Sequence, residues 1–140
     1  MNEAAKPAIL RLAMPARPEY LVLGRLVLTG ISRAHPIEPD ALSDLKLALT
    51  EACSNSMRHG YATSAGIVDV RYELGEGYIA VEVSDDGPGF NEPASSPDGI
   101  EGLDEGGLGL AIIRAMSDAV ELGRRADGTG SRLRFVKRVD

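Results

Sequence analysis

Two strand-like segments separated by three residues are the strongest constraint on how this chain can fold. In residues 78–84, Ile79, Val81 and Val83 alternate with polar or small residues. A period of two is typical of a strand with one buried face. Residues 67–74 form the other segment and lead into it through the glycine-rich turn 75–77. We therefore expect an antiparallel hairpin, and with it a sheet that needs a cover on one face.

Helical patterns supply that cover. We expect helices over about residues 19–33, 40–59 and 108–119, and further strands over 8–13, 119–123 and 131–136. The apolar face of the first helix is predicted from its spacing to contain Tyr20, Leu23, Val27 and Ile31. Asp40 is predicted to cap the second helix, and Gly60 to end it. The order of elements predicts an α+β two-layer sandwich: a mixed, mainly antiparallel sheet covered on one face by helices.

Length and charge narrow the classes of protein that fit. The chain has 140 residues, about one domain, so we expect a single domain over 1–140. Its formal net charge of -6 disfavours direct binding to nucleic acid or to an anionic membrane. No apolar stretch approaches the ~20 residues of a membrane span. Cys53, the single cysteine, has no intramolecular disulfide partner, so we expect a reduced, cytoplasmic protein.

The second predicted helix carries three polar residues four positions apart: Glu51, Asn55 and His59. Side chains at this spacing project from neighbouring positions on one stripe of a helix. The simple interpretation is a solvated helix face. However, asparagine is a poor residue for a helix interior, and here it lies one turn from a carboxylate. Such a pair could hold a metal ion and position a base, and spacing alone leaves both interpretations open.

Three glycine-containing turns follow in the chain. Asp85 ends the predicted hairpin and precedes Gly87 and Gly89, whose lack of side chains would let the backbone approach a ligand closely. Residues 106–109 open the third helix, where free amides can bind phosphate. Residues 128–131 lead into the last strand. Each turn also has an ordinary structural explanation, and neither the Walker loop nor the dinucleotide-binding glycine pattern is present.

Taken together and in this order, these elements resemble the nucleotide site of the GHKL superfamily of Bergerat-fold ATP-binding domains. Glu51 through Asn55 to His59-Gly60-Tyr61 resembles the N box, and Asp85-x-Gly87-x-Gly89 resembles the G1 box. Gly107-x-Gly109 resembles the G2 box, and Gly130-Ser131 the final box. Within the superfamily, the stretch LALTEACSNSMRHGY is similar to the anti-sigma-factor serine/threonine kinases of bacterial partner-switching systems.

The resemblance implies ATP and Mg2+ as cofactors, with Asn55 as the metal ligand and Asp85 as the acceptor for the adenine amino group. It also implies a lid over about residues 91–106, and Ser131 in place of the usual threonine near the adenine. The implied nucleotide-binding residues are Asn55, His59, Asp85, Gly87, Gly89, Gly107, Leu108, Gly109 and Ser131.

Glu51 distinguishes the subgroups, because a carboxylate there can take the proton from a serine hydroxyl or from water. The resemblance therefore implies a serine/threonine kinase that sequesters a sigma factor and phosphorylates a serine of an anti-sigma-factor antagonist. It also implies a homodimer, and it places Arg25 where the family has a basic residue that contacts partners. Two alternatives remain open: a nucleotide-dependent regulator-binding module without significant kinase activity, and a stand-alone ATPase.

Overall fold

The computed structural model describes residues 6–60, 66–86, 108–125, 128 and 130–140, apart from the side chains of 58–60. Five strands form one sheet in the order β1-β2-β3-β5-β4, and all four pairings are antiparallel. The strands are β1 (Ala8–Pro15), β2 (Ile67–Leu74), β3 (Tyr78–Asp85), β4 (Ala119–Gly123) and β5 (Ser131–Arg138). The predicted hairpin is β2–β3, in which Leu74 pairs with Ile79.

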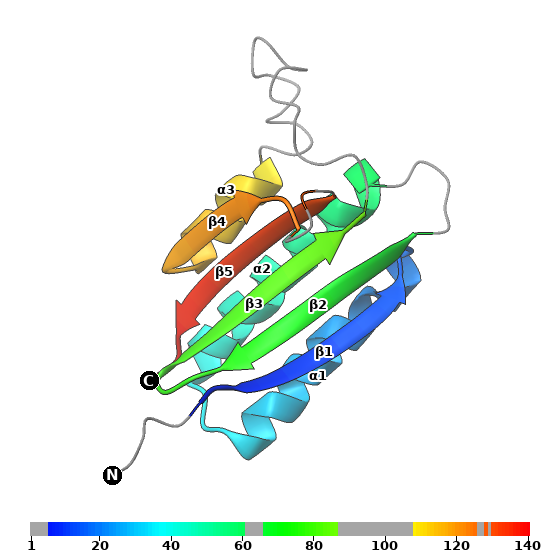
Figure 1. Ribbon diagram of the computed structural model, residues 1–140. Helices are drawn as coiled ribbons and strands as arrows, with labels where there is room; N and C mark the ends of the chain where they lie inside the picture. Colours follow the sequence, from blue (N-terminus) through cyan, green and yellow to red (C-terminus); the bar gives the residue numbers. More distant parts are fainter. Residues whose placement is uncertain (1–5, 61–65, 87–107, 126–127, 129) are drawn as a thin grey trace.

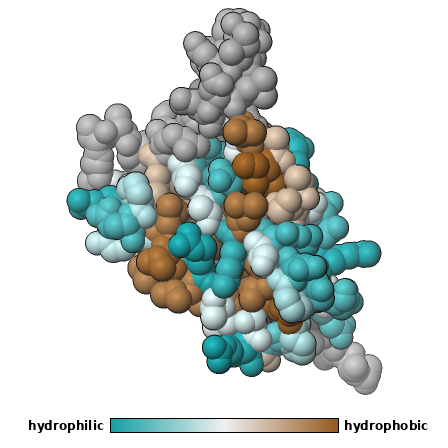
Figure 2. Space-filling view, turned by 180° about the vertical axis from the view of Figure 1, so that it is seen from behind, coloured by the Kyte–Doolittle hydropathy of each residue, from teal (hydrophilic) through white to brown (hydrophobic). Residues whose placement is uncertain are grey.

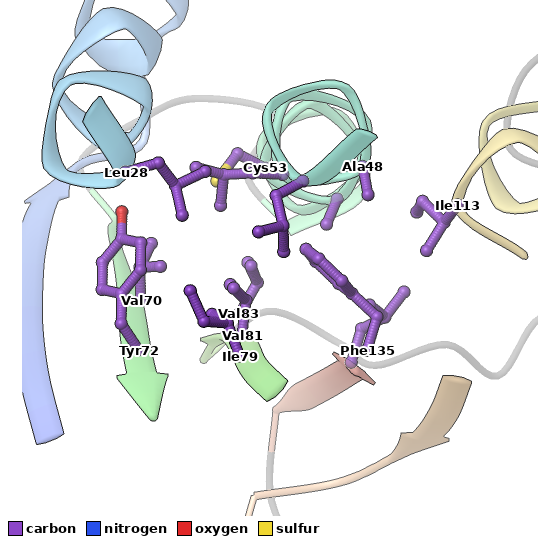
Figure 3. Packing of buried hydrophobic residues seen from close by; sticks show 14 of the residues in the cluster. Leu28, Ala48, Cys53, Val70, Tyr72, Ile79, Val81, Val83, Ile113 and Phe135 are labelled. Carbon is purple, nitrogen blue, oxygen red and sulfur yellow. The ribbon is translucent and has the colours of Figure 1, made fainter. Parts of the chain in front are cut away.

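Three α-helices lie behind the sheet in Figure 1 and cover one of its faces. They are α1 (Leu21–Ala34), α2 (Pro39–Gly60) and α3 (Leu108–Met116), and a single 3-10 turn, η1 (Pro18–Tyr20), precedes α1. Helix α2 lies between α1 and α3, as the view along its axis in Figure 3 shows. The prediction of an α+β two-layer sandwich is confirmed, with antiparallel pairing throughout the described part of the sheet.

The hydrophobic core lies between the helices and the sheet. Figure 3 shows Leu28 of α1, Cys53 of α2 and Ile113 of α3 directed toward the strands, where they meet side chains such as Tyr72 and Phe135. All five are buried. Burial raises the pKa of the Cys53 thiol to about 12, because the core solvates a thiolate poorly. The lone cysteine is therefore a packing residue.

The buried face of α1 differs from the predicted one. Gly24, Leu28 and Ile31 are buried, whereas Leu23 is 38% exposed. A Cβ atom on Gly24 would lie 3.0 Å from Leu49 Cδ2, and the carbonyl of Gly24 accepts a hydrogen bond from Tyr72 Oη at 2.9 Å. Helix α1 thus approaches α2 and the sheet through a glycine. The prediction is therefore right for Ile31, and Tyr20 and Val27 are half-buried against the core, but it is wrong for Leu23. It missed Gly24 because a prediction based on side-chain hydrophobicity gives no weight to glycine.

The start of α2 also differs from the prediction. Glu38, not Asp40, caps the helix: the backbone N–H of Ala41 donates to Glu38 Oε1 at 3.3 Å, and that of Leu42 to the Glu38 carbonyl at 3.0 Å. Pro39 occupies the first helical position. A backbone N–H there would have no partner within the helix, so its absence in proline does not destabilise the helix. The cap therefore lies two residues earlier than predicted.

The end of α3 also differs from the prediction. This helix stops at Met116, three residues before the predicted end. The hydroxyl of Ser117 donates to the Ile113 carbonyl at 2.6 Å, and the backbone N–H of Asp118 donates to the Val136 carbonyl at 2.8 Å. That second bond draws the chain toward β5 before β4 begins, so the sheet ends the helix.

Candidate nucleotide-binding site

The acid and the amide predicted from α2 lie against the first turn of α3. A Cβ atom on Gly109 would be 3.1 Å from Glu51 Oε1 and 3.5 Å from Asn55 Oδ1. An alanine at position 109 would crowd the Glu51 carboxylate and would touch the Asn55 amide at an ordinary contact distance. Because Gly109 lacks a side chain, the N-terminal turn of α3 comes directly beside a carboxylate and an amide that are one helical turn apart.

Asn55 is not on a solvated face. Its side chain is buried, with only 5% of the residue exposed, and Glu51 beside it is half-buried. Burying an amide is costly unless its polar atoms find partners, so this position points to a specific role. The simple interpretation of the Glu51–Asn55 stripe as a solvated surface is therefore wrong for Asn55.

Asp85 lies at the end of β3 and is almost fully buried, with 1% exposed. Two serine hydroxyls donate to its Oδ2 atom: that of Ser131, at 3.0 Å, and that of Ser56 on α2. Both serines are themselves buried. The carboxylate is thus held in one orientation by hydroxyl groups from two different elements.

Gly130 fixes the contact between the end of β3 and the turn before β5. Its φ is +66°, a left-handed conformation that favours glycine. A Cβ atom here would lie only 2.0 Å from the backbone oxygen of Asp85. The end of β3 and the turn before β5 therefore meet backbone to backbone. This contact places the hydroxyl of the next residue, Ser131, over the Asp85 carboxylate.

Sequence reasoning missed Ser56, which joins the two halves of the site. Its neighbour Asn55 lies beside Gly109, while Ser56 itself bonds to Asp85. The sequence does contain a signal: Ser56 stands beside Met57 and close to Ala52 and Cys53, all apolar and buried. A polar residue at a core position requires a buried partner.

Arg25 on α1 is only partly exposed to solvent. It is half-buried, and its Nη1 atom lies 3.3 Å from Thr50 Oγ1, to which it donates. The hydroxyl of Thr50 in turn donates to the Lys46 carbonyl, at 2.9 Å. Arg25 therefore connects α1 to the residue of α2 that precedes Glu51.

The remaining predicted residues fall into two groups. Leu108 begins α3 and is 56% exposed. Gly87, Gly89, Gly107, the predicted lid at 91–106 and the side chain of His59 lie outside the described residues. The structure thus brings together Glu51, Asn55 and Gly109, and separately Asp85 and Ser131, with Ser56 between the two groups.

The donor atoms at Glu51 and Asn55 suit a hard cation. Carboxylate and amide oxygens are the ligands that Mg2+ prefers, and the ion usually takes the rest of its shell from phosphates and water. The space that a Cβ would fill at Gly109 lies beside both side chains. No cluster of three or more His, Cys, Asp or Glu residues that could hold a metal occurs among the described residues. The Asn55 amide oxygen therefore fits an ion that takes its other ligands from phosphates and water.

Comparison with known proteins identifies the class to which this fold and site belong. A family model described as the histidine kinase-like ATPase domain matches residues 14–137. Among solved structures, the RsbU and RsbW domains of a Mycobacterium tuberculosis protein superpose with a TM-score of 0.68 at 21% identity, covering 94% of this chain and 32% of that one. A blue-light-activated histidine kinase from Erythrobacter litoralis superposes with a TM-score of 0.57 at 22% identity, over 89% of this chain and 61% of that one.

Proteins with similar sequences identify a smaller group within this class. The serine-protein kinase RsbW of Bacillus licheniformis is 35% identical over 133 residues, which cover 89% of this chain and 83% of the relative. RsbW of Listeria innocua is 37% identical over 79% of this chain and 76% of its own length. RsbW of Staphylococcus aureus is 30% identical over 96% and 91%. The chain belongs to the histidine kinase-like ATPase family, and within it to the group of RsbW serine-protein kinases.

Membership of an ATPase-domain family implies that the nucleotide is ATP. In the described part of the chain, none of the helices has the length and apolar character needed to cross a membrane.

Proposed function

We propose that this protein is an ATP-dependent serine kinase and anti-sigma factor, which sequesters a sigma factor and phosphorylates a serine of an anti-sigma-factor antagonist. The observation that carries the proposal is the convergence of Glu51 and Asn55 on the glycine that opens α3. The similarity to serine-protein kinases over most of the chain supports it. A sigma-factor partner would place the protein in the cytoplasm.

Glu51 is the general base of this proposal. It takes the proton from the serine hydroxyl while that oxygen forms a bond to the γ-phosphorus of ATP. The bond from the γ-phosphorus to the β–γ bridging oxygen breaks, and the products are phosphoserine and ADP. Asn55 would hold Mg2+, which offsets the negative charge of the phosphates. A carboxylate base suits a hydroxyl acceptor, whose oxygen must lose a proton, better than an imidazole acceptor, whose attacking nitrogen carries none.

The remaining site residues would bind the nucleotide. Asp85, held by its two serine hydroxyls, would accept a hydrogen bond from the adenine amino group, with Ser131 beside it. The N-terminal turn of α3 would bind phosphate through its free amides, because the helix dipole favours negative charge there. The set proposed to bind ATP also includes His59, Gly87, Gly89, Gly107, Leu108 and Gly109. Residues 91–106 would close over it as a lid.

The partner-binding surface and the dimer are proposed on α1. Figure 2 shows the side of the molecule covered by helices, where apolar side chains form separate patches between polar areas. On α1 the exposed apolar residues are Val22, Leu23 and Leu26. A homodimer that uses this helix would bury them, and sedimentation of wild type and Leu26→Glu would test it: the substitution should favour the monomer. An unchanged dimer would place the contact elsewhere.

Arg25 can act in two ways that two variants separate. If it contacts a partner, Arg25→Ala should weaken the complex with the sigma factor while Thr50→Val leaves it intact. If it acts by holding α2 through Thr50, both variants should change phosphotransfer alike. Titration calorimetry and a transfer assay on the same preparations distinguish the two.

The decisive experiment is phosphate transfer from labelled ATP to a candidate antagonist. Glu51→Gln removes the base but keeps the shape, so transfer should fall by roughly 100- to 10,000-fold while calorimetry still detects ATP binding. Glu121→Gln, an exposed acid on β4, serves as the matched control and should transfer normally. Transfer by Glu51→Gln at the wild-type rate would refute the assigned base.

The same assay distinguishes the two alternatives. Nucleotide-dependent complex formation, with no phosphoserine on any partner of the wild-type protein, would indicate a regulator-binding module. Steady ATP turnover without any protein partner would indicate a stand-alone ATPase.

A further inference from the structure

A cleft of about 740 Å³ lies at the end of the molecule opposite the nucleotide site, beside the connection between α1 and α2. The β2–β3 turn and the last residues of the chain form its other wall, at the lower end of the molecule in Figure 1. Along α2, about 13 residues separate the cap residue Glu38 from Glu51, which is about 20 Å of helix. None of the proposed nucleotide-binding residues lines this cleft.

The floor of the cleft is apolar. Leu74, Ile79 and Val139 are buried at its base, and Ile37 is half-buried beside them. Its volume lies within the range of about 300–1,000 Å³ that is common for ligand sites. An apolar side chain placed on this floor would gain free energy by leaving water.

The rim of the cleft is acidic. Glu38, Glu76 and Asp140 are exposed lining residues, and the lining contains no lysine or arginine. Among the residues that the structure describes, neither Glu76 nor Asp140 has an ion-pair partner. Like charges around one opening repel one another, and a bound cation would relieve that repulsion. The electrostatics of the rim therefore favour a positively charged occupant.

The walls are already held in place. The N–H of Val139 donates to the Gly77 carbonyl at 3.0 Å, and the N–H of Gly75 donates to the Tyr78 carbonyl at 3.0 Å. The N–H of Glu38 donates to the Val139 carbonyl at 3.4 Å, which ties the α1–α2 connection to the end of the chain. A preformed cleft loses less conformational entropy on binding than a mobile one.

We infer that this cleft docks a short basic peptide segment of a partner protein, in which an apolar side chain sits on the floor and a neighbouring lysine or arginine meets the acidic rim. The combination of apolar floor and unpaired carboxylates matches such a segment in both respects. An acidic peptide would meet repulsion from the three carboxylates, and a small anion would find no lysine or arginine in the lining, where His35 is the one basic side chain. The site is separate from the nucleotide site, so the inference does not depend on kinase activity.

The test uses two probes of matched size: a capped hexapeptide that alternates leucine with lysine, and one that alternates leucine with glutamate. In amide NMR spectra of the full chain, the lysine peptide should cause saturable shifts at Gly75, Gly77 and Val139, and the glutamate peptide should cause none. The affinity for the lysine peptide should fall as salt is raised, because exposed charges are screened.

Two charge reversals complete the test. Glu76→Lys, at the rim, should weaken binding of the lysine peptide by at least about fivefold. Glu121→Lys makes the same change of net charge on β4, away from the cleft, and should weaken binding by less than about twofold. The inference is overturned by shifts that spread over the surface without saturating, by equal binding of the two peptides, or by equal effects of the two substitutions. Loss of phosphotransfer would leave it standing.

Discussion

Replacing Gly130 with alanine should destabilise the protein through close contacts, of which the shortest is with the backbone of Asp85. The new Cβ would lie 2.0 Å from the backbone oxygen of Asp85, whereas ordinary contact begins near 3.4 Å. The φ of +66° adds a penalty for any residue with a side chain. Gly128→Ala is a matched control, because φ there is +85° and nothing lies within 4 Å of the Cβ position.

The two penalties can be separated by this pair of variants. A left-handed conformation destabilises an alanine by about 1–2 kcal/mol, and this penalty applies at both position 128 and position 130. Relieving the overlap with Asp85 requires a backbone shift, for which overpacking data suggest about 1–3 kcal/mol more, in Gly130→Ala alone. The free energy of unfolding should therefore fall by about 2–5 kcal/mol in that variant, and by at least about 1 kcal/mol less in Gly128→Ala.

Urea unfolding followed by circular dichroism measures the stability, and calorimetry measures ATP affinity. Because the shift moves Asp85, ATP affinity should fall in Gly130→Ala and stay normal in Gly128→Ala. Equal losses of stability in the two variants would show that the close contact between Gly130 and the backbone of Asp85 does not exist. Normal ATP affinity in a folded Gly130→Ala protein would contradict the role proposed for Asp85.

Three further predictions follow from the site and the core. Gly109→Ala places a Cβ 3.1 Å from the carboxylate of the proposed base, so phosphotransfer should fall by about tenfold or more while the melting temperature changes little; a normal transfer rate would contradict this. Ser56→Ala and Ser131→Ala each remove a hydrogen bond to the buried Asp85 carboxylate, and each should lower unfolding free energy by about 1.5–3 kcal/mol in urea titrations. The two losses should not add, because the serines share one acceptor atom. Because burial raises the pKa of the Cys53 thiol to about 12 and also keeps reagents out, the thiol should react with an aromatic disulfide at pH 8 at least about tenfold more slowly in the folded than in the unfolded protein, and equal rates would show that it is accessible.

The fold could be predicted where the sequence carries a strong period. The β2–β3 hairpin follows from alternation on both sides of a glycine turn, and α2 follows from a long helical pattern. The face of α1 could be predicted only in part: Ile31 is buried as expected, but the contact with α2 is made at Gly24, which has no side chain to contribute to the pattern. The cap of α2 depended on whether Glu38 or Asp40 reached the free amides, and both are acidic residues near the same helix end.

The same distinction between local sequence patterns and contacts with distant residues applies to the candidate site. Asn55 could be singled out because an amide is unusual inside a helix, Glu51 because it lies one turn from Asn55, and Asp85 because it matches a motif of the family that the sequence resembles. The groups that hold them, Ser56 and Gly130, are of common types that also occur in any loop or helix. Their roles depend on neighbours 29 and 45 positions away in the chain, which no local pattern contains.

Glycine shows most clearly why local patterns are insufficient. Gly24 and Gly109 both lie in helices with an ordinary backbone, and a Cβ atom at these positions would lie 3.0 Å and 3.1 Å from side chains of α2, which would have to shift. Gly130 is more restrictive, because a Cβ there would overlap the backbone of Asp85 and because its φ is positive. In the sequence the three residues look alike, and only the identity of the approaching group separates them: a core leucine, the proposed base, and the backbone of Asp85. Substituting each by alanine should therefore disturb three different properties, which are helix packing, phosphotransfer and nucleotide affinity.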